Sequence, residues 1–303
     1  MSDLITPRVA AVSAALAARF PLLRKTVGAR VDEFGPAWVE RFEREIEVYF
    51  GSDQAAVERT VEGYGQFSIE AMMLQKRFTK TLSYAAMSYE EAVAEVYGNM
   101  DYMLGTYLPA LLLSHYLWPH HYRQLLWVHD HFVPELRAVK AATFCDVGIG
   151  TGFYSKEILA AVPGIRGWGY DISDASILHT GRLLDRWGLS ERYTLCRREV
   201  AAEVEGGFDA FVSVELLEHL ESPPDFLAAL RASVRVGAPG LITAALDAPN
   251  RDHIYLYRDM ETVAAQLRGA GFAVVAEANF PAYIIQSNQE TAPQAACFVV
   301  RAV

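Results

Sequence analysis

Three glycines alternate with other residues directly behind an acidic residue, in Asp146-Val147-Gly148-Ile149-Gly150-Thr151-Gly152. The preceding residues 141–145 have the length and apolar character of a buried strand, and residues 153–162 return to helical spacing. The glycines therefore fall in a strand-to-helix turn, where missing Cβ atoms let the backbone approach a ligand and free N–H groups favour a polar or anionic group. This arrangement is typical of a loop that binds a nucleotide-type cofactor, and a glycine-rich turn without a ligand is the alternative.

A second acidic residue stands where such a cofactor would need it. A strand-like run from Ile165 to Tyr170 follows the helix and ends at Asp171. At about this separation, a parallel α/β unit places the carboxylate that binds both ribose hydroxyls. The dinucleotide fingerprint GxGxxG is not met, because Phe153 stands at the position of its third glycine. The spacing therefore argues against a cofactor that presents a pyrophosphate here.

On these residues the chain resembles the class I S-adenosylmethionine (SAM) dependent methyltransferases, whose first motif is D/E-x-G-x-G-x-G and is followed by an acidic residue such as Asp171. The resemblance covers about residues 141–303. It implies that the glycine loop holds the methionine end of SAM and that Asp171 holds the ribose. The residues it implies for cofactor binding are Asp146, Gly148, Gly150, Gly152, Tyr154, Asp171, Ile172, Glu199, Val200, Val214 and Glu215.

The turn after the third expected strand departs from the family pattern. In the family this turn frames the adenine, often through an acidic side chain. Here it reads Cys196-Arg197-Arg198-Glu199-Val200, without the usual Asp-Ala pair. We expect Glu199 to replace the missing acidic residue, and a solvated charged turn is the alternative for the two arginines.

The segment from Phe208 to Leu220 matches the fourth-strand motif of the family, in the version that ends in ExxEH. Its open end is expected beside the cofactor, because ligands of open α/β sheets lie at the carboxyl ends of the strands. Two carboxylates and an imidazole within five residues can also converge on a divalent ion. Ubiquinone-biosynthesis O-methyltransferases and small-RNA 3′-end 2′-O-methyltransferases use a similar ExxEH for a metal, whereas many relatives with this motif bind none. We expect no metal, and the alternative is a divalent ion held by Glu215, Glu218, His219 and His253.

Histidines gather between positions 115 and 131, just before the glycine loop. The segment is amphipathic and can form the roof of a cleft, where imidazole and phenol groups would hydrogen-bond an acceptor or remove its proton. Partly buried side chains bonded to the backbone are the alternative. The residues we expect to be catalytic are His120 and His121, because Pro119 fixes the start of their helix, together with Tyr116.

The chain changes its pattern near its middle. Residues 1–135 show helical periodicity, with a capping box at Ser88-Tyr89-Glu90-Glu91, and predict about five to seven helices. From Thr143, strands alternate with helices, and the last two strands have no helix between them, which predicts a final antiparallel strand. We therefore predict an all-helical lid that binds the substrate, residues 1–135, and an α/β SAM-binding domain, residues 136–303, with a Rossmann-like seven-stranded methyltransferase sheet.

The composition and charge of the chain limit the kinds of molecule that it is expected to bind. The 303 residues are 52% hydrophobic and 21% charged, as in a globular protein, and the formal net charge is -10. This acidity argues against nucleic acid, because binding to phosphate backbones depends on clustered Lys and Arg. The most apolar window, Met103 to Leu113, contains Pro109 and is too short to span a bilayer. No secretory pattern stands at the N-terminus, and three well-separated cysteines suit reduced core residues, so we expect a cytoplasmic protein.

The resemblance implies a SAM-dependent methyltransferase that modifies a small-molecule acceptor in biosynthetic or secondary metabolism, without nucleic-acid or membrane partners. A homodimer and the identity of the methylated atom are left open. One alternative is an enzyme that cyclises the aminopropyl arm of SAM and releases methylthioadenosine. Another is a non-enzymatic SAM-binding regulatory protein.

Overall fold

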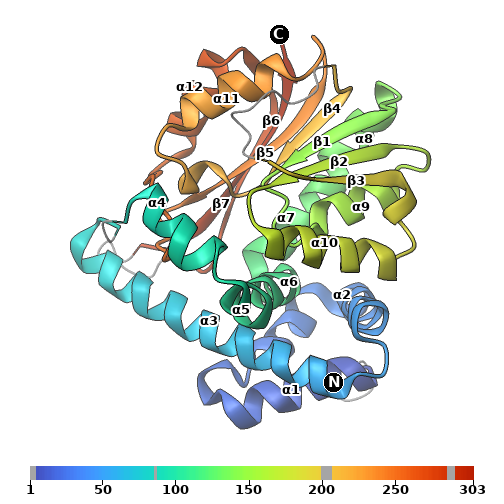
Figure 1. Ribbon diagram of the computed structural model, residues 1–303. Coiled ribbons are helices and arrows are strands. Elements are labelled where there is room, and N and C mark those ends of the chain that lie inside the picture. The colour runs from blue at the N-terminus through green and yellow to red at the C-terminus, as the bar shows by residue number, and fades with distance from the viewer. Residues whose placement is uncertain (1–4, 85–86, 199–206, 285–290) are drawn as a thin grey trace.

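The C-terminal half is built on one mixed sheet of seven strands, in the order β3-β2-β1-β4-β5-β7-β6 (Figure 1). The computed structural model describes residues 5–84, 87–198, 207–284 and 291–303. Strands β1 to β5 are parallel, and β7 runs antiparallel to both of its neighbours. The predicted sheet with a reversed last strand is therefore confirmed. The strands are β1 Thr143–Val147, β2 Arg166–Asp171, β3 Tyr193–Arg197, β4 Ala210–Ser213, β5 Pro239–Leu246, β6 Phe272–Pro281 and β7 Gln294–Ala302.

Helices cover both faces of this sheet, because successive strand residues point to opposite sides. Phe144 belongs to the core under α9 and α10, whereas its neighbour Cys145 belongs to the core under α11 and α12. Figure 1 shows α11 and α12 together on one side, in orange. The helices are α9 Phe153–Ala161, α10 Asp174–Arg186, α11 Pro223–Ala232 and α12 Met260–Gly269.

The N-terminal part is helical and lies at one end of the sheet (Figure 1). The predicted capping box is present, since Ser88 accepts from the backbone N–H of Glu91 and the Glu91 carboxylate accepts from the backbone N–H of Ser88. Gly35, at φ 70°, breaks the second helix and Pro36 starts its second half. The helices are α1 Pro7–Arg19, α2 Thr26–Phe50, α3 Gln54–Thr81, α4 Tyr89–Ala92, α5 Met100–Tyr102, α6 Leu108–Leu117, α7 Pro119–Trp127 and α8 Val133–Ala138.

Short π-helical segments interrupt or extend several of these helices. They lie at Val93–Tyr97, Met103–Tyr107 and Val128–Phe132, and the last one joins α7 to α8. The sequence pattern did not predict them, because a single inserted residue shifts the apolar pattern without leaving a local signal of its own. Such segments occur frequently at functional sites, and two of them here end in tyrosines that line the cavity described below. In the described part of the chain, no helix is long and apolar enough to cross a membrane.

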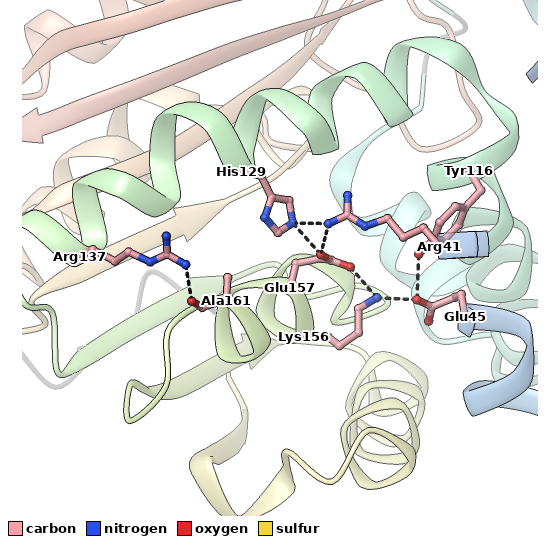
Figure 2. Close-up of polar contacts among 8 residues, drawn as sticks. All are labelled: Arg41, Glu45, Tyr116, His129, Arg137, Lys156, Glu157 and Ala161. Carbon is pink, nitrogen blue, oxygen red and sulfur yellow. Dashed lines mark hydrogen bonds and ion pairs between the residues drawn. The ribbon is translucent and has the colours of Figure 1, made fainter. Parts of the chain in front are cut away.

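A buried ionic cluster joins the helical part to α9 (Figure 2). The ammonium of Lys156 on α9 donates to Glu45 of α2 at 2.5 Å and lies 2.8 Å from Glu157. His129 and Arg41 approach the other oxygen of Glu157, at 2.7 and 3.7 Å. Burial acts to raise the pKa of Glu157, but its cationic neighbours hold that pKa well below the usual range. The cluster therefore fixes the helix that starts at the glycine loop.

Candidate active site

A cavity of ≈ 510 Å³ lies where the carboxyl ends of β1, β2, β4 and β5 meet the N-terminal helices. Open α/β sheets bind their ligands at this edge. The strand side contributes the glycine loop and the acidic residues after β2 and β4, and the helical roof contributes rings from α3, α6, α7 and the π-helical segments. Roof residues that line the cavity include Phe67, Tyr97, Tyr107, His115, Trp118, His120 and His121.

The glycine loop requires glycine at its first and third positions. Gly148 and Gly152 both have φ 73°, and a Cβ atom would lie 2.9 Å from Leu216 at the first and 2.4 Å from Thr180 at the third. Gly150, at φ 50°, has nothing within 4 Å of the place of a Cβ. Gly148 and Gly150 line the cavity, whereas Gly152 does not and instead caps the start of α9. The geometry thus supports cofactor contact for two of the three predicted glycines.

Asp171 ends β2 at the cavity, as the sequence predicts. Its carboxylate accepts the backbone N–H groups of Gly150, at 3.0 Å, and Ser173, at 2.8 Å. Burial nevertheless raises its pKa to about 6. Asp146, 3% exposed, accepts the hydroxyl of Ser155 at 2.6 Å, and burial raises its pKa to about 7. Two carboxyl groups of raised pKa therefore lie on either side of the loop.

The other predicted cofactor residues are placed as follows. Tyr154, Ile172, Val214 and Glu215 line the cavity. Glu199 and Val200 lie outside the described residues. The cofactor roles of all these residues stay predictions.

His121 presents an unprotonated nitrogen to the cavity. Its Nδ1 lies 3.0 Å from the hydroxyl of Ser114, and that hydroxyl already donates to the carbonyl of Leu111 at 2.8 Å. Nδ1 must therefore carry the proton and donate, which leaves Nε2 with a free lone pair. Nε2 lies 3.6 Å from Oε2 of Glu215. Burial lowers the pKa of His121 to about 3 and raises the pKa of Glu215 to about 7, so the imidazole is neutral and Glu215 is the stronger base of the two.

Tyr116 is not part of this site. It does not line the cavity, it is 1% exposed, and its hydroxyl donates to Glu45 in the buried ionic cluster (Figure 2). Tyr116 is therefore not placed to act on a molecule in the cavity. The adjacent His115, which the sequence did not single out, faces the cavity and stacks on Phe153 with ring centroids 4.0 Å apart.

The ExxEH motif brings three potential ligand atoms together. One atom each of Glu218, His219 and His253 lies within 4.8 Å of the others. Glu218 is 0% exposed, and neither carboxylate oxygen has a hydrogen-bond partner among the described residues. The Nδ1 atoms of the histidines lie 3.0 and 2.6 Å from the carbonyls of Asp252 and Ala248. This geometry leaves both Nε2 atoms able to bind a ligand. The fourth predicted member, Glu215, is not part of this group.

Asp252, which sequence reasoning missed, does not line the cavity but holds two tyrosines that do. It is 0% exposed, and its Oδ2 accepts the hydroxyls of Tyr97, at 3.1 Å, and Tyr107, at 2.9 Å. Both tyrosines end π-helical segments of the roof. Asp252 therefore attaches the roof to the loop after β5, and its position beside His253 was the one signal available in the sequence.

Comparison with known proteins agrees with this geometry. The family model described as "Methyltransferase domain" matches residues 145–239. The ribosomal protein L11 methyltransferase of Gloeobacter violaceus is 32% identical over 143 residues, which are 47% of this chain and 39% of that protein. The release factor glutamine methyltransferase of the same organism is 34% identical over 68 residues, 22% of this chain and 24% of that protein. The chain thus spans less than half the length of these curated relatives.

Two solved structures show the same fold at low identity. The O-methyltransferase NcsB1 from neocarzinostatin biosynthesis, in complex with SAM and 2-hydroxy-5-methyl naphthoic acid, gives a TM-score of 0.56 at 16% identity, over 83% of this chain and 74% of that chain. The N-methyltransferase NodS from Bradyrhizobium japonicum WM9, in complex with S-adenosylhomocysteine, gives 0.50 at 16% identity, over 67% of this chain and 97% of that chain. Residues 145–239 therefore match a methyltransferase domain, and the strand order, the glycine loop and Asp171 agree with the class I SAM-dependent methyltransferase fold of these structures.

Proposed function

We propose that this protein transfers the methyl group of SAM to a small-molecule acceptor. The observation that carries the proposal is the continuity of one cavity from the glycine loop and Asp171 to the rings of the helical roof. The loop side offers what a nucleoside cofactor needs, and the roof side offers a mostly apolar chamber for a second molecule. The cytoplasmic location and the homodimer remain predictions.

Methyl transfer from SAM does not require the protein to form a covalent bond with either substrate. The sulfonium of SAM makes its methyl group electrophilic, so the site must place a nucleophile in line with the methyl–sulfur bond and, where needed, remove its proton. The bond from carbon to the acceptor forms as the carbon–sulfur bond breaks, and sulfur keeps the electron pair. Glu215, whose pKa burial raises to about 7, is placed to take the acceptor's proton, directly or through the Nε2 atom of His121, which lies 3.6 Å away. His120 lines the same wall.

A small acceptor suits a cavity of ≈ 510 Å³ beneath a helical roof better than a macromolecule does. The curated relatives are named for a ribosomal protein and a release factor, whereas NcsB1 is crystallised with a naphthoic acid. The chamber beside the glycine loop is covered by helices from α3 to α7 and their π-helical segments, and Asp252 ties this cover to the cofactor domain. A single-stranded nucleic acid would need a groove lined by cationic side chains, whereas Arg198 is the one Lys or Arg among the described residues that line this cavity.

A divalent ion at Glu218, His219 and His253 is a second proposal, favoured by one observation. A buried carboxylate without partners is costly, and metal coordination would satisfy both of its orphaned oxygens. The donor set of one carboxylate and two imidazoles suits ions such as Zn²⁺ or Mn²⁺. When bound, such an ion would supply Lewis-acid polarisation of an acceptor oxygen.

Product analysis tests the main proposal. The protein is incubated with SAM and a panel of hydroxylated and aminated small molecules, and the sulfur-containing product is identified by mass spectrometry. S-adenosylhomocysteine together with a methylated acceptor is expected. Methylthioadenosine would instead show that the aminopropyl arm is attacked. Tight SAM binding without any turnover would favour the regulatory alternative.

A further inference from the structure

Two neighbouring side chains of α10 bind carbonyl groups of the glycine loop. Nδ1 of His179 lies 3.3 Å from the carbonyl oxygen of Thr151, and the hydroxyl of Thr180 donates to the carbonyl of Gly150 at 3.2 Å. Gly150 and Thr151 line the cavity, whereas His179 and Thr180 do not. Both side chains are buried, since His179 is 3% exposed and Thr180 is 0% exposed. The pair therefore contacts the loop but not the space in which a cofactor would lie.

The hydrogen bonds of His179 determine which of its nitrogens carries the proton. A carbonyl oxygen can only accept, so Nδ1 must donate its proton to Thr151. Burial lowers the pKa of His179 to about 4, so the imidazole is neutral at pH 7 and Nε2 has a lone pair. The hydroxyl of Tyr49, on α2, lies 2.9 Å from Nε2 and donates to it. Both nitrogens thus have a partner, and Tyr49 favours the tautomer that donates to the loop.

The two carbonyl groups belong to the central residues of a tight turn. The N–H of Gly152 donates to the carbonyl of Ile149 at 2.7 Å, which closes the turn over Gly150 and Thr151. Glycine permits many backbone conformations, so the peptide group after Gly150 could rotate if nothing held it. The C=O and N–H of a trans peptide point in opposite directions. With the carbonyl of Gly150 held by Thr180, the N–H of Thr151 is directed away from α10.

We propose, resting on the function proposed above, that His179 is a positioning residue for SAM, which acts together with Thr180 by holding the glycine loop in its binding conformation. The two donors fix successive peptide groups of a loop that lines the cavity. A loop that is ordered before binding loses less conformational entropy when the ligand arrives. His179 thus raises the affinity for the cofactor without contacting it.

Two substitutions of His179 separate the contributions of its nitrogens. Asn can place its side-chain amide nitrogen where Nδ1 lies, whereas the amide of Gln reaches the place of Nε2. His179→Gln should therefore weaken the binding of S-adenosylhomocysteine about three- to tenfold, because Thr151 loses its donor, and His179→Asn should stay within about twofold of the unsubstituted protein. Thr180→Val removes the other donor to the loop and should weaken binding to a similar extent as His179→Gln. Affinities are measured by calorimetry.

The free energy of unfolding of each protein, from chemical denaturation, separates positioning of the loop from general stability. Leu184→Ala is the control, because Leu184 lies one turn beyond Thr180 on α10, is 1% exposed and does not line the cavity. It should lower the free energy of unfolding and leave the affinity for S-adenosylhomocysteine unchanged.

Two results would overturn the inference and leave the proposed function standing. One is equal affinity of His179→Gln and His179→Asn for S-adenosylhomocysteine, and the other is unchanged affinity in Thr180→Val. Failure of the unsubstituted protein to bind S-adenosylhomocysteine would instead contradict the proposed function itself.

Discussion

Lys156 and Glu45 form a buried ion pair, 2.5 Å from Nζ to Oε2, that joins α9 to α2. Both side chains are at most 3% exposed. Glu157 on α9 shares the same ammonium at 2.8 Å. Since α9 begins at the glycine loop, this pair couples the position of the loop to the packing of the N-terminal helices. The N-terminal helices are therefore anchored to the sheet-containing part of the chain through α2.

Lys156→Met should destabilise the protein by about 3–5 kcal/mol, because it leaves two buried carboxylates without their shared cation. The free energy of unfolding is measured by chemical denaturation. The control is Arg268→Met, which removes one partner of an exposed ion pair with Glu261 and should cost at most ~1 kcal/mol. Equal effects of the two substitutions would show that the buried cluster adds no stability.

Asp171→Ala should weaken SAM binding about 10–100-fold. The substitution removes the charged acceptor proposed for the ribose hydroxyls, worth about 1.5–3 kcal/mol, and it also frees the N–H of Gly150. Affinity is measured by calorimetry. Asp174→Ala is the matched control, because Asp174 lies three positions further on and pairs with Arg197 at the surface. Unchanged SAM affinity in Asp171→Ala would contradict the cofactor assignment.

SAM binding should release protons between pH 5 and 7. In the ligand-free protein, burial raises the pKa of Asp171 to about 6 and that of Asp146 to about 7. The positive charges and hydroxyl donors of SAM favour the ionised carboxylates, which lowers both pKa values on binding. Affinity should therefore rise with pH across this window, below the range of about 7.7–8.0 in which the amino group of SAM titrates.

Calorimetry in two buffers of different ionisation enthalpy measures this proton release at pH 6.5. Asp146→Asn should reduce the number of protons released while the protein still binds SAM. Binding enthalpies that are equal in the two buffers would show that neither carboxyl group changes its protonation.

The elements of the sheet could be predicted from the sequence because their signals are local. The apolar run before Asp171 ends at that residue in the structure, and the expected helix after the glycine loop starts at Phe153. The periodicity of strands and helices, the helix caps and the glycines that end helices each depend on only a few neighbouring residues. These signals can therefore be recognised in a single sequence. The placement of Asp171 at the cavity followed from the βαβ connection alone.

The side chains of the roof that face the cavity could not be predicted as well as the elements of the sheet. Tyr116 and His115 are neighbours in a run of similar residues, but one step along a helix turns the side chain by about 100°, so one faces the buried cluster and the other the cavity. The hydrogen bonds from two tyrosines to Asp252 join residues more than 140 positions apart. The π-helical segments also shift which side chains face inward, and no periodic pattern records that shift.

Metal binding at Glu218, His219 and His253 can be tested without knowing the methyl acceptor. Protein stripped with a chelator should bind Zn²⁺ or Mn²⁺ in calorimetry and gain thermal stability, because an ion that binds the folded state alone shifts the unfolding equilibrium. Glu218→Gln keeps the shape of the side chain and should lose most of this stabilisation. Glu221→Gln is the control, since Glu221 lies at the rim of the same cavity but is not part of the three-residue group.

Chelator should also reduce methyl transfer, and the ion should restore it. A stripped protein that neither binds the ions nor changes its melting temperature would leave Glu218 as a buried, protonated carboxyl group, in keeping with the raised pKa that burial gives it.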